Sequence, residues 1–193
     1  MAHPGVRNLV AVGLLGALAF AVENAHQSWG AVFLHDALNT PTWLTAAAPA
    51  TFAAVAAAAR FAASAAGRVQ PLRLLLGGCT LAVVGTLVVA SAPTVASALL
   101  GLALAAAGTS VLFPTLLRIV TAGVQESRRG RATSVVSTMA YLGFLLGPVF
   151  LGALADRWSL RGALVDVAGL ALVLAAWAPV VTRRAARLRA TSF

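Results

Sequence analysis

The sequence predicts an all-α, polytopic membrane protein. Apolar residues make up 60% of the 193 residues, charged residues only 10%, and the mean hydropathy is +0.91. The polar surface is then too small to cover a water-soluble globule of this size. The apolar residues fall in runs of about 20, the length that a helix needs to cross a bilayer core about 30 Å thick. The alternation typical of barrel strands is absent.

We expect six transmembrane helices, separated by short polar or Pro- and Gly-containing segments. In lipid the backbone must satisfy its own hydrogen bonds, and the abundant Ala and Leu favour helices. A signal peptide is the alternative for the first run, but losing it would disturb the charge pattern described next. The expected spans are residues 8–34, 42–66, 72–92, 94–122, 132–155 and 160–182, followed by a basic cytoplasmic tail at 183–193.

The arginines predict the orientation, because Arg and Lys in short loops stay on the cytoplasmic side. Every arginine except Arg157 and Arg161 lies before the first span, around the second or fourth connection, or after the last span. Both termini should therefore be cytoplasmic, in the plasma membrane of a bacterium. The formal charge of +9 then reflects topology, and we expect no nucleic-acid partner. The residues assigned to topology and loops are Arg60, Arg68, Arg73, Asp156 and Arg157.

The motifs give no support for an enzyme. The sequence lacks the patterns of zinc proteases, serine hydrolases, dithiol oxidoreductases and P-loop nucleotide binders. The single cysteine, Cys79, cannot form an intrachain disulfide, and the three histidines are not spaced as metal ligands. We therefore expect no catalytic residues, no metal and no cofactor.

The first span carries the most informative polar residues. Glu23, His26 and Gln27 repeat at the spacing of one helical face. A carboxylate facing hydrocarbon would cost several kcal/mol, so this face must contact protein or a water-filled cavity. Glu23 is either a coupling group with His26 beside it, or it forms a structural hydrogen bond to another helix.

The fifth span shows a similar stripe of hydroxyl groups. Ser137, Thr138 and Tyr141 share one helical face, and Tyr141 falls near the middle of the bilayer. These hydroxyls either line a cavity and contact a substrate or pack between helices, where Ser and Thr bond their own backbone.

Proline and glycine mark expected bends and close helix contacts. Pro114 interrupts the fourth span and frees a backbone carbonyl that needs another partner, at the edge of a cavity or at a simple kink. In the fifth span, Gly143, Gly147 and Pro148 predict close helix packing and a hinge.

Two segments carry a family resemblance. Residues 23–29 with 32–34 resemble the first helix of the C-terminal half of major facilitator superfamily (MFS) transporters. Residues 141–148, the following 152–157 and Arg161 resemble the fifth helix of such a half and the loop behind it. The second connection departs from the family pattern, because Ala63 and Ser64 replace its pair of one small and one acidic residue.

The resemblance implies a fold and a function. The fold is one six-helix half of an MFS transporter, built from two inverted three-helix repeats, with helices one, two, four and five around a central cavity. The function is secondary active transport of a small solute by alternating access, with Glu23 in coupling and Tyr141 in substrate contact. One half supplies one wall, so we expect a second six-helix half or a homodimer. The alternatives are a structural or assembly protein of the membrane, or a truncated fragment without activity.

Overall fold

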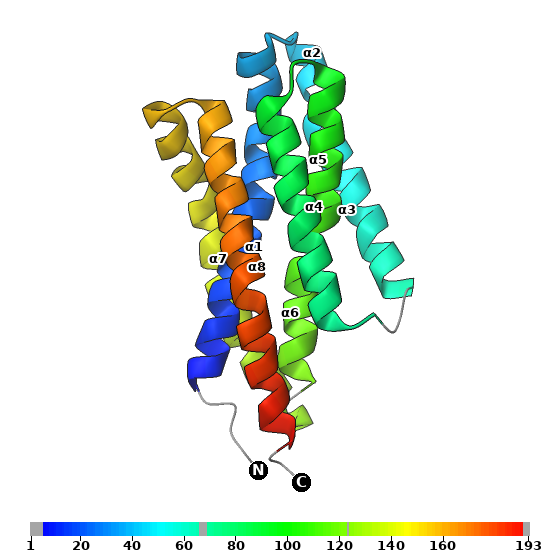
Figure 1. Ribbon diagram of the computed structural model, residues 1–193, viewed down its shortest axis with the longest axis vertical. Helices are drawn as coiled ribbons and strands as arrows, with labels where there is room; N and C mark the ends of the chain where they lie inside the picture. Colours follow the sequence, from blue (N-terminus) through cyan, green and yellow to red (C-terminus); the bar gives the residue numbers. More distant parts are fainter. Residues whose placement is uncertain (1–5, 66–68, 123, 191–193) are drawn as a thin grey trace.

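The chain folds into helices that run roughly along one long axis, and α1 begins at the same end of the bundle at which α8 ends (Figure 1). The structure, a computed structural model, describes residues 6–65, 69–122 and 124–190, with side chains between residues 8 and 182. These ranges contain no strand. The elements are α1 (Val6–Val32), η1 (Phe33–Ala37), α2 (Thr42–Thr45), α3 (Ala47–Ala65), α4 (Pro71–Ser91), α5 (Val95–Thr109), α6 (Leu112–Thr121), α7 (Glu126–Arg157) and α8 (Leu160–Ala190).

Six helical stretches of the described chain are long and apolar enough to cross a membrane, as the composition predicts. Their ends differ from the expected ones. The first helix continues into the π-helical turn η1, and Asn39 then ends it in the left-handed region with φ of 51°. α7 begins at Glu126, because the exposed residues before Ala132 extend the helix. α8 continues to Ala190, so the expected tail at 183–193 begins as helix; residues 191–193 lie outside the described part.

The fourth membrane helix is broken in two. α5 ends at Thr109 and α6 begins at Leu112. Pro114 stands in the first turn of α6. Proline has no backbone N–H, so the helical hydrogen bond from residue 114 to the carbonyl of Ser110 cannot form. The break predicted for Pro114 is therefore present.

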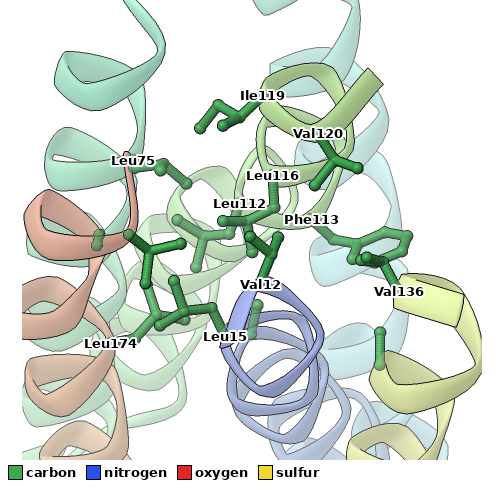
Figure 2. Close-up of a cluster of buried hydrophobic side chains, with 14 of the residues drawn as sticks. Val12, Leu15, Leu75, Leu112, Phe113, Leu116, Ile119, Val120, Val136 and Leu174 are labelled. Carbon is green, nitrogen blue, oxygen red and sulfur yellow. The ribbon is translucent and has the colours of Figure 1, made fainter. Parts of the chain in front are cut away.

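Two apolar clusters fill the bundle, one toward each end. The cluster in Figure 2 joins the first half of α1 to α6, α7, the start of α4 and the end of α8, with Leu15, Leu112 and Leu116 fully buried. The other joins the second half of α1 to the end of α4, the start of α5 and the start of α8. Because α1 contributes to both clusters, its middle lies between two apolar layers.

Small residues bring neighbouring helices close together. A Cβ atom added at Gly143 of α7 would collide with the backbone of Ala17 in α1, and one at Gly147 would lie 2.8 Å from the carbonyl oxygen of Ala21. Glycines play the same role between α4 and α5, where Gly85 faces Gly101. The close packing expected for Gly143 and Gly147 is thus with α1, at the level just before Glu23.

The two helices at the edges of the bundle are the least covered (Figure 1). Of the most apolar window of each helix, 17% is buried for the second membrane helix and 28% for α7, against 56% for the first. Exposed alanines cover the outer side of α3, and large apolar residues such as Leu145 and Val149 cover that of α7. α1 is therefore the central helix, and α3 and α7 flank it.

The close contact between α1 and α7 can be tested at Gly143. We expect Gly143→Ala to destabilise the protein by roughly 1–3 kcal/mol, because the new methyl group overpacks the contact with Ala17. Gly77→Ala is the matched control, because no atom lies within 4 Å of its added Cβ. That change should stabilise by about 0.5–1 kcal/mol through helix propensity. Unfolding in detergent micelles measures both, and a Gly143→Ala variant as stable as Gly77→Ala would contradict this packing.

Candidate functional site

An ion pair between α1 and α3 forms the centre of the candidate site. The Nη2 atom of Arg60 lies 2.7 Å from Oε1 of Glu23, and 5% of the Glu23 side chain is exposed against 50% of that of Arg60. The Nε2 atom of Gln27 also donates to Oε1 of Glu23, at 3.3 Å. A carboxylate in the middle of a membrane helix needs such partners, because lipid offers no hydrogen-bond donors.

The same arginine bonds the backbone carbonyl that Pro114 leaves without its helical partner in the fourth membrane helix. Arg60 donates from Nε to the carbonyl oxygen of Ser110 at 3.2 Å. This is the carbonyl that Pro114, four residues later, cannot bond. The carbonyl predicted to need a partner therefore has one, and the partner belongs to the ion pair with Glu23.

These contacts correct the expected role of Arg60. The sequence placed it with the loop residues that set topology, but it lies inside α3 and bonds two other helices. Its position near the end of an apolar run is also typical of a topology signal. Arg73, Asp156 and Arg157 are exposed at the ends of α4 and α7. Arg68 lies outside the described residues.

His26 points away from Glu23. Its Nε2 atom lies 2.9 Å from Oγ1 of Thr86 in α4, its Nδ1 atom lies 2.7 Å from the carbonyl oxygen of Val22, and its ring stacks on Phe52. Positions three apart on a helix differ in direction by about 60°, so one stripe can reach two neighbours. The pairing of Glu23 with His26 was therefore wrong. His26 is a fully buried link between α1 and α4, and Gln27 is the exposed member of the stripe.

The carbonyl that a second proline frees is bonded by the residue next to Glu23. Pro148 in α7 cannot donate to the carbonyl of Phe144, and Asn24 of α1 donates to that oxygen from Nδ2 at 2.5 Å. The indole of Trp29 donates to the carbonyl oxygen of Pro148 at 3.2 Å. Side chains of α1 therefore bond the backbone around Pro148, where α7 is continuous, and the hinge expected there stays a prediction. The sequence indicates that Pro148 frees the carbonyl of Phe144, because a proline cannot bond the carbonyl four residues before it. It does not indicate that Asn24 is the donor to that carbonyl.

The hydroxyl stripe of α7 lies largely on the surface of the bundle. Thr138 and Tyr141 are exposed, and Ser137 is half-buried. The ring of Tyr141 lies 5.5 Å from that of Phe20 in α1 and 6.4 Å from that of Phe144. The structure thus places Tyr141 on an open face beside α1, while Glu23 is reached from α3.

The hydrogen bond between Asn24 and Phe144 can be tested with a double-mutant cycle. Asn24→Ala should destabilise by about 1 kcal/mol or more, because a part-buried carbonyl loses its donor. In a Pro148→Ala background the restored N–H can bond Phe144, so Asn24→Ala should then cost much less.

Unfolding in micelles measures the cycle, and Ser28→Ala provides the control. It removes a hydroxyl that donates to Asn24 and leaves the Phe144 contact in place. Its effect should be the same with Pro148 or Ala at that position. Equal costs of Asn24→Ala in both backgrounds would contradict the proposed compensation.

Comparisons with known proteins agree with this architecture. The family model described as Major Facilitator Superfamily matches residues 9–192. An uncharacterized MFS-type transporter of Yersinia pestis is 30% identical over 182 residues, which are 89% of this chain and 45% of that protein. Crystal structures of a peptide transporter POT in complex with sulfate, and of a mutant of it with sulfate, give TM-scores of 0.80 and 0.81. Both are 19% identical and cover 93% of this chain and 38% of theirs.

The solved structures are similar in fold, which confirms the expected class of six transmembrane helices in two inverted three-helix repeats. The chain spans about half the length of the curated relative that it matches. From the match over residues 9–192, the chain belongs to the Major Facilitator Superfamily and is a multi-pass membrane protein.

Proposed function

We propose that the chain is one half of a secondary active transporter that moves a small solute by alternating access, together with a second six-helix unit. Family membership supports transport rather than enzyme chemistry. The observation that carries the proposal is the ion pair between the buried Glu23 and the half-exposed Arg60, because a charge pair that joins two membrane helices is costly and is typical of ion or solute pathways.

The uncovered edge helices support the need for a second unit. α3 and α7 flank α1, and both are mostly exposed. Arg60 is half exposed on α3, and Gln27, Thr138 and Tyr141 are exposed on α1 and α7. A second six-helix unit would cover these groups and complete a cavity. It is either another chain, further sequence of the same protein or a second copy of this chain.

Glu23 is the proposed coupling group. A proton on Glu23 would remove the charge that holds Nη2 of Arg60, and the same arginine bonds the broken fourth helix through Ser110. Protonation would therefore loosen α1 from α3 and from the α5–α6 break in one step. Gln27, Ser137, Thr138 and Tyr141 are the proposed substrate contacts; His26 is not, because both of its ring nitrogens are engaged within the bundle.

The coupling role predicts separate effects on two modes of transport. In proteoliposomes containing the protein with whatever subunits purify with it, we expect accumulation of at least one solute from a panel of labelled sugars, amino acids, carboxylates and organic cations. A pH gradient should drive it. Glu23→Gln should abolish this accumulation but keep exchange of solute across the membrane, because exchange needs no net proton movement.

The control is Asp166→Asn, which neutralises an exposed acid on α8. It should leave both modes unchanged. A wild-type protein that accumulates no solute from the panel would contradict the transporter proposal. Gradient-driven accumulation by Glu23→Gln at the wild-type rate would contradict only the coupling role.

We further propose that both ends of the chain face the cytoplasm of a bacterium. The arginine distribution supports this orientation. A fluorescent protein fused after residue 193 should fluoresce in cells, and alkaline phosphatase fused at the same point should be inactive, because it needs export to fold. The control fusion is placed after Thr94, between α4 and α5, where both readouts should reverse. An active phosphatase after residue 193 would contradict the proposed orientation.

A further inference from the structure

A pocket of about 220 Å³ lies between α3, the start of α4 and the broken fourth helix. It has room for several water molecules and so for a small solute. Arg60 stands on one wall, and Arg118 of α6 stands on another. The residues that line it are Arg60, Ala63, Ser64, Leu74, Ser110, Val111, Pro114, Thr115 and Arg118.

The charge of the pocket is positive. Among the described residues, its charged lining residues are Arg60 and Arg118, and none of its described lining residues is acidic. Glu23 neutralises Arg60 from outside the lining. Among the described residues Arg118 has no acidic partner, and its Nη2 donates to the neutral carbonyl oxygen of Val69 at 3.0 Å. Arg118 is exposed in the last turn of α6, and an anion in this pocket would give its guanidinium a charge-assisted hydrogen-bond partner.

The polar lining offers hydrogen-bond donors mainly through the two guanidinium groups. The hydroxyls of Ser64, Ser110 and Thr115 already donate to backbone carbonyls in their own helical segments. An arginine carries five N–H groups. Among the described residues, the observed hydrogen bonds use two of those of Arg60 and one of those of Arg118. The remaining N–H groups of these half-exposed and exposed side chains can bind further acceptors, and carboxylate or phosphate oxygens fit them best.

The rest of the lining is apolar. Ala63, Leu74, Val111 and Pro114 present carbon atoms to the pocket, beside the two arginines. Such walls favour the carbon skeleton of a ligand. Arg60 belongs both to the pocket and to the Glu23 ion pair, so a ligand here would contact the proposed coupling group through one side chain.

We propose that this pocket binds the anionic group of a small organic solute, with a carboxylate or phosphate between Arg60 and Arg118, and that the transported substrate is therefore an anion. The second clause rests on the proposed transport function. The first does not, because binding needs neither a second unit nor a gradient.

Ligand binding to the full chain in phosphatidylcholine nanodiscs tests the proposal. The probes are butyrate and inorganic phosphate, with butyramide and butylammonium as neutral and cationic analogues, at constant ionic strength. Thermal stabilisation as a function of probe concentration gives the dissociation constants. Butyrate or phosphate should stabilise the protein saturably, and the two analogues should not.

Two variants of Arg118 and a matched control at Arg73 test whether the anion binds in the pocket. Arg118→Gln should weaken anion binding about tenfold or more, which corresponds to losing a charged hydrogen-bond partner. Arg118→Lys should retain most of the affinity. Arg73→Gln removes an exposed arginine outside the lining and should stay within about twofold of wild type.

A double variant tests Arg60 without leaving a buried acid unpaired. Glu23→Gln with Arg60→Gln removes both charges of the ion pair, and it should weaken anion binding while Glu23→Gln alone should not. Equal binding of butyrate and butyramide, no anion binding, or equal losses in Arg118→Gln and Arg73→Gln would overturn the proposal.

Two further outcomes separate this proposal from others. Stabilisation only by phosphatidylglycerol in the nanodiscs, lost in Arg118→Gln, would overturn the solute assignment in favour of a lipid headgroup. Anion binding by a protein that transports nothing would leave the site in place and overturn the transport function. Transport of a neutral solute by a protein that binds no anion would do the reverse.

Discussion

The structure depends on the ion pair between Glu23 and Arg60. Two charges inside a membrane bundle are tolerated only when each is paired and its remaining hydrogen-bonding groups are satisfied. Here Gln27 gives the carboxylate a second donor, and Ser110 gives the guanidinium a second acceptor. Removing either charge would leave the other unpaired in a nonpolar region. The pair therefore fixes where α3 and the broken fourth helix lie relative to α1.

Adjacent residues of α1 supply partners for the carbonyls that both prolines free. Glu23 binds Arg60, which donates to the carbonyl freed by Pro114, and Asn24 donates directly to the carbonyl freed by Pro148. A helix that lacks one of its own hydrogen bonds bends more easily at that position. A shift or rotation of α1 would act on both positions at once. This arrangement links a change of charge at Glu23 to the shape of helices on either side of it.

The sequence predicted the spans and the fold class well, because apolar length and composition determine them. It also predicted that Glu23 needs a partner and that Pro114 frees a carbonyl. It did not identify Arg60 as the partner of both Glu23 and the freed carbonyl of Ser110. These residues lie 37 and 50 positions from Arg60 in the sequence, and only the packing of the helices brings them together. Periodicity likewise placed His26 beside Glu23, although a helical stripe is wide enough to serve two neighbours.

The two partners of the ion pair differ tenfold in exposure, and the more exposed one connects the carboxylate to the surface. The Glu23 side chain is 5% exposed and that of Arg60 is 50% exposed. The two side chains that bond the Glu23 carboxylate, those of Arg60 and Gln27, both reach the surface. The carboxylate is therefore connected to the surface through these two polar partners. Because Arg60 also lines the pocket with Arg118, an anion bound there would compete with Glu23 for the hydrogen-bond donors of the Arg60 guanidinium.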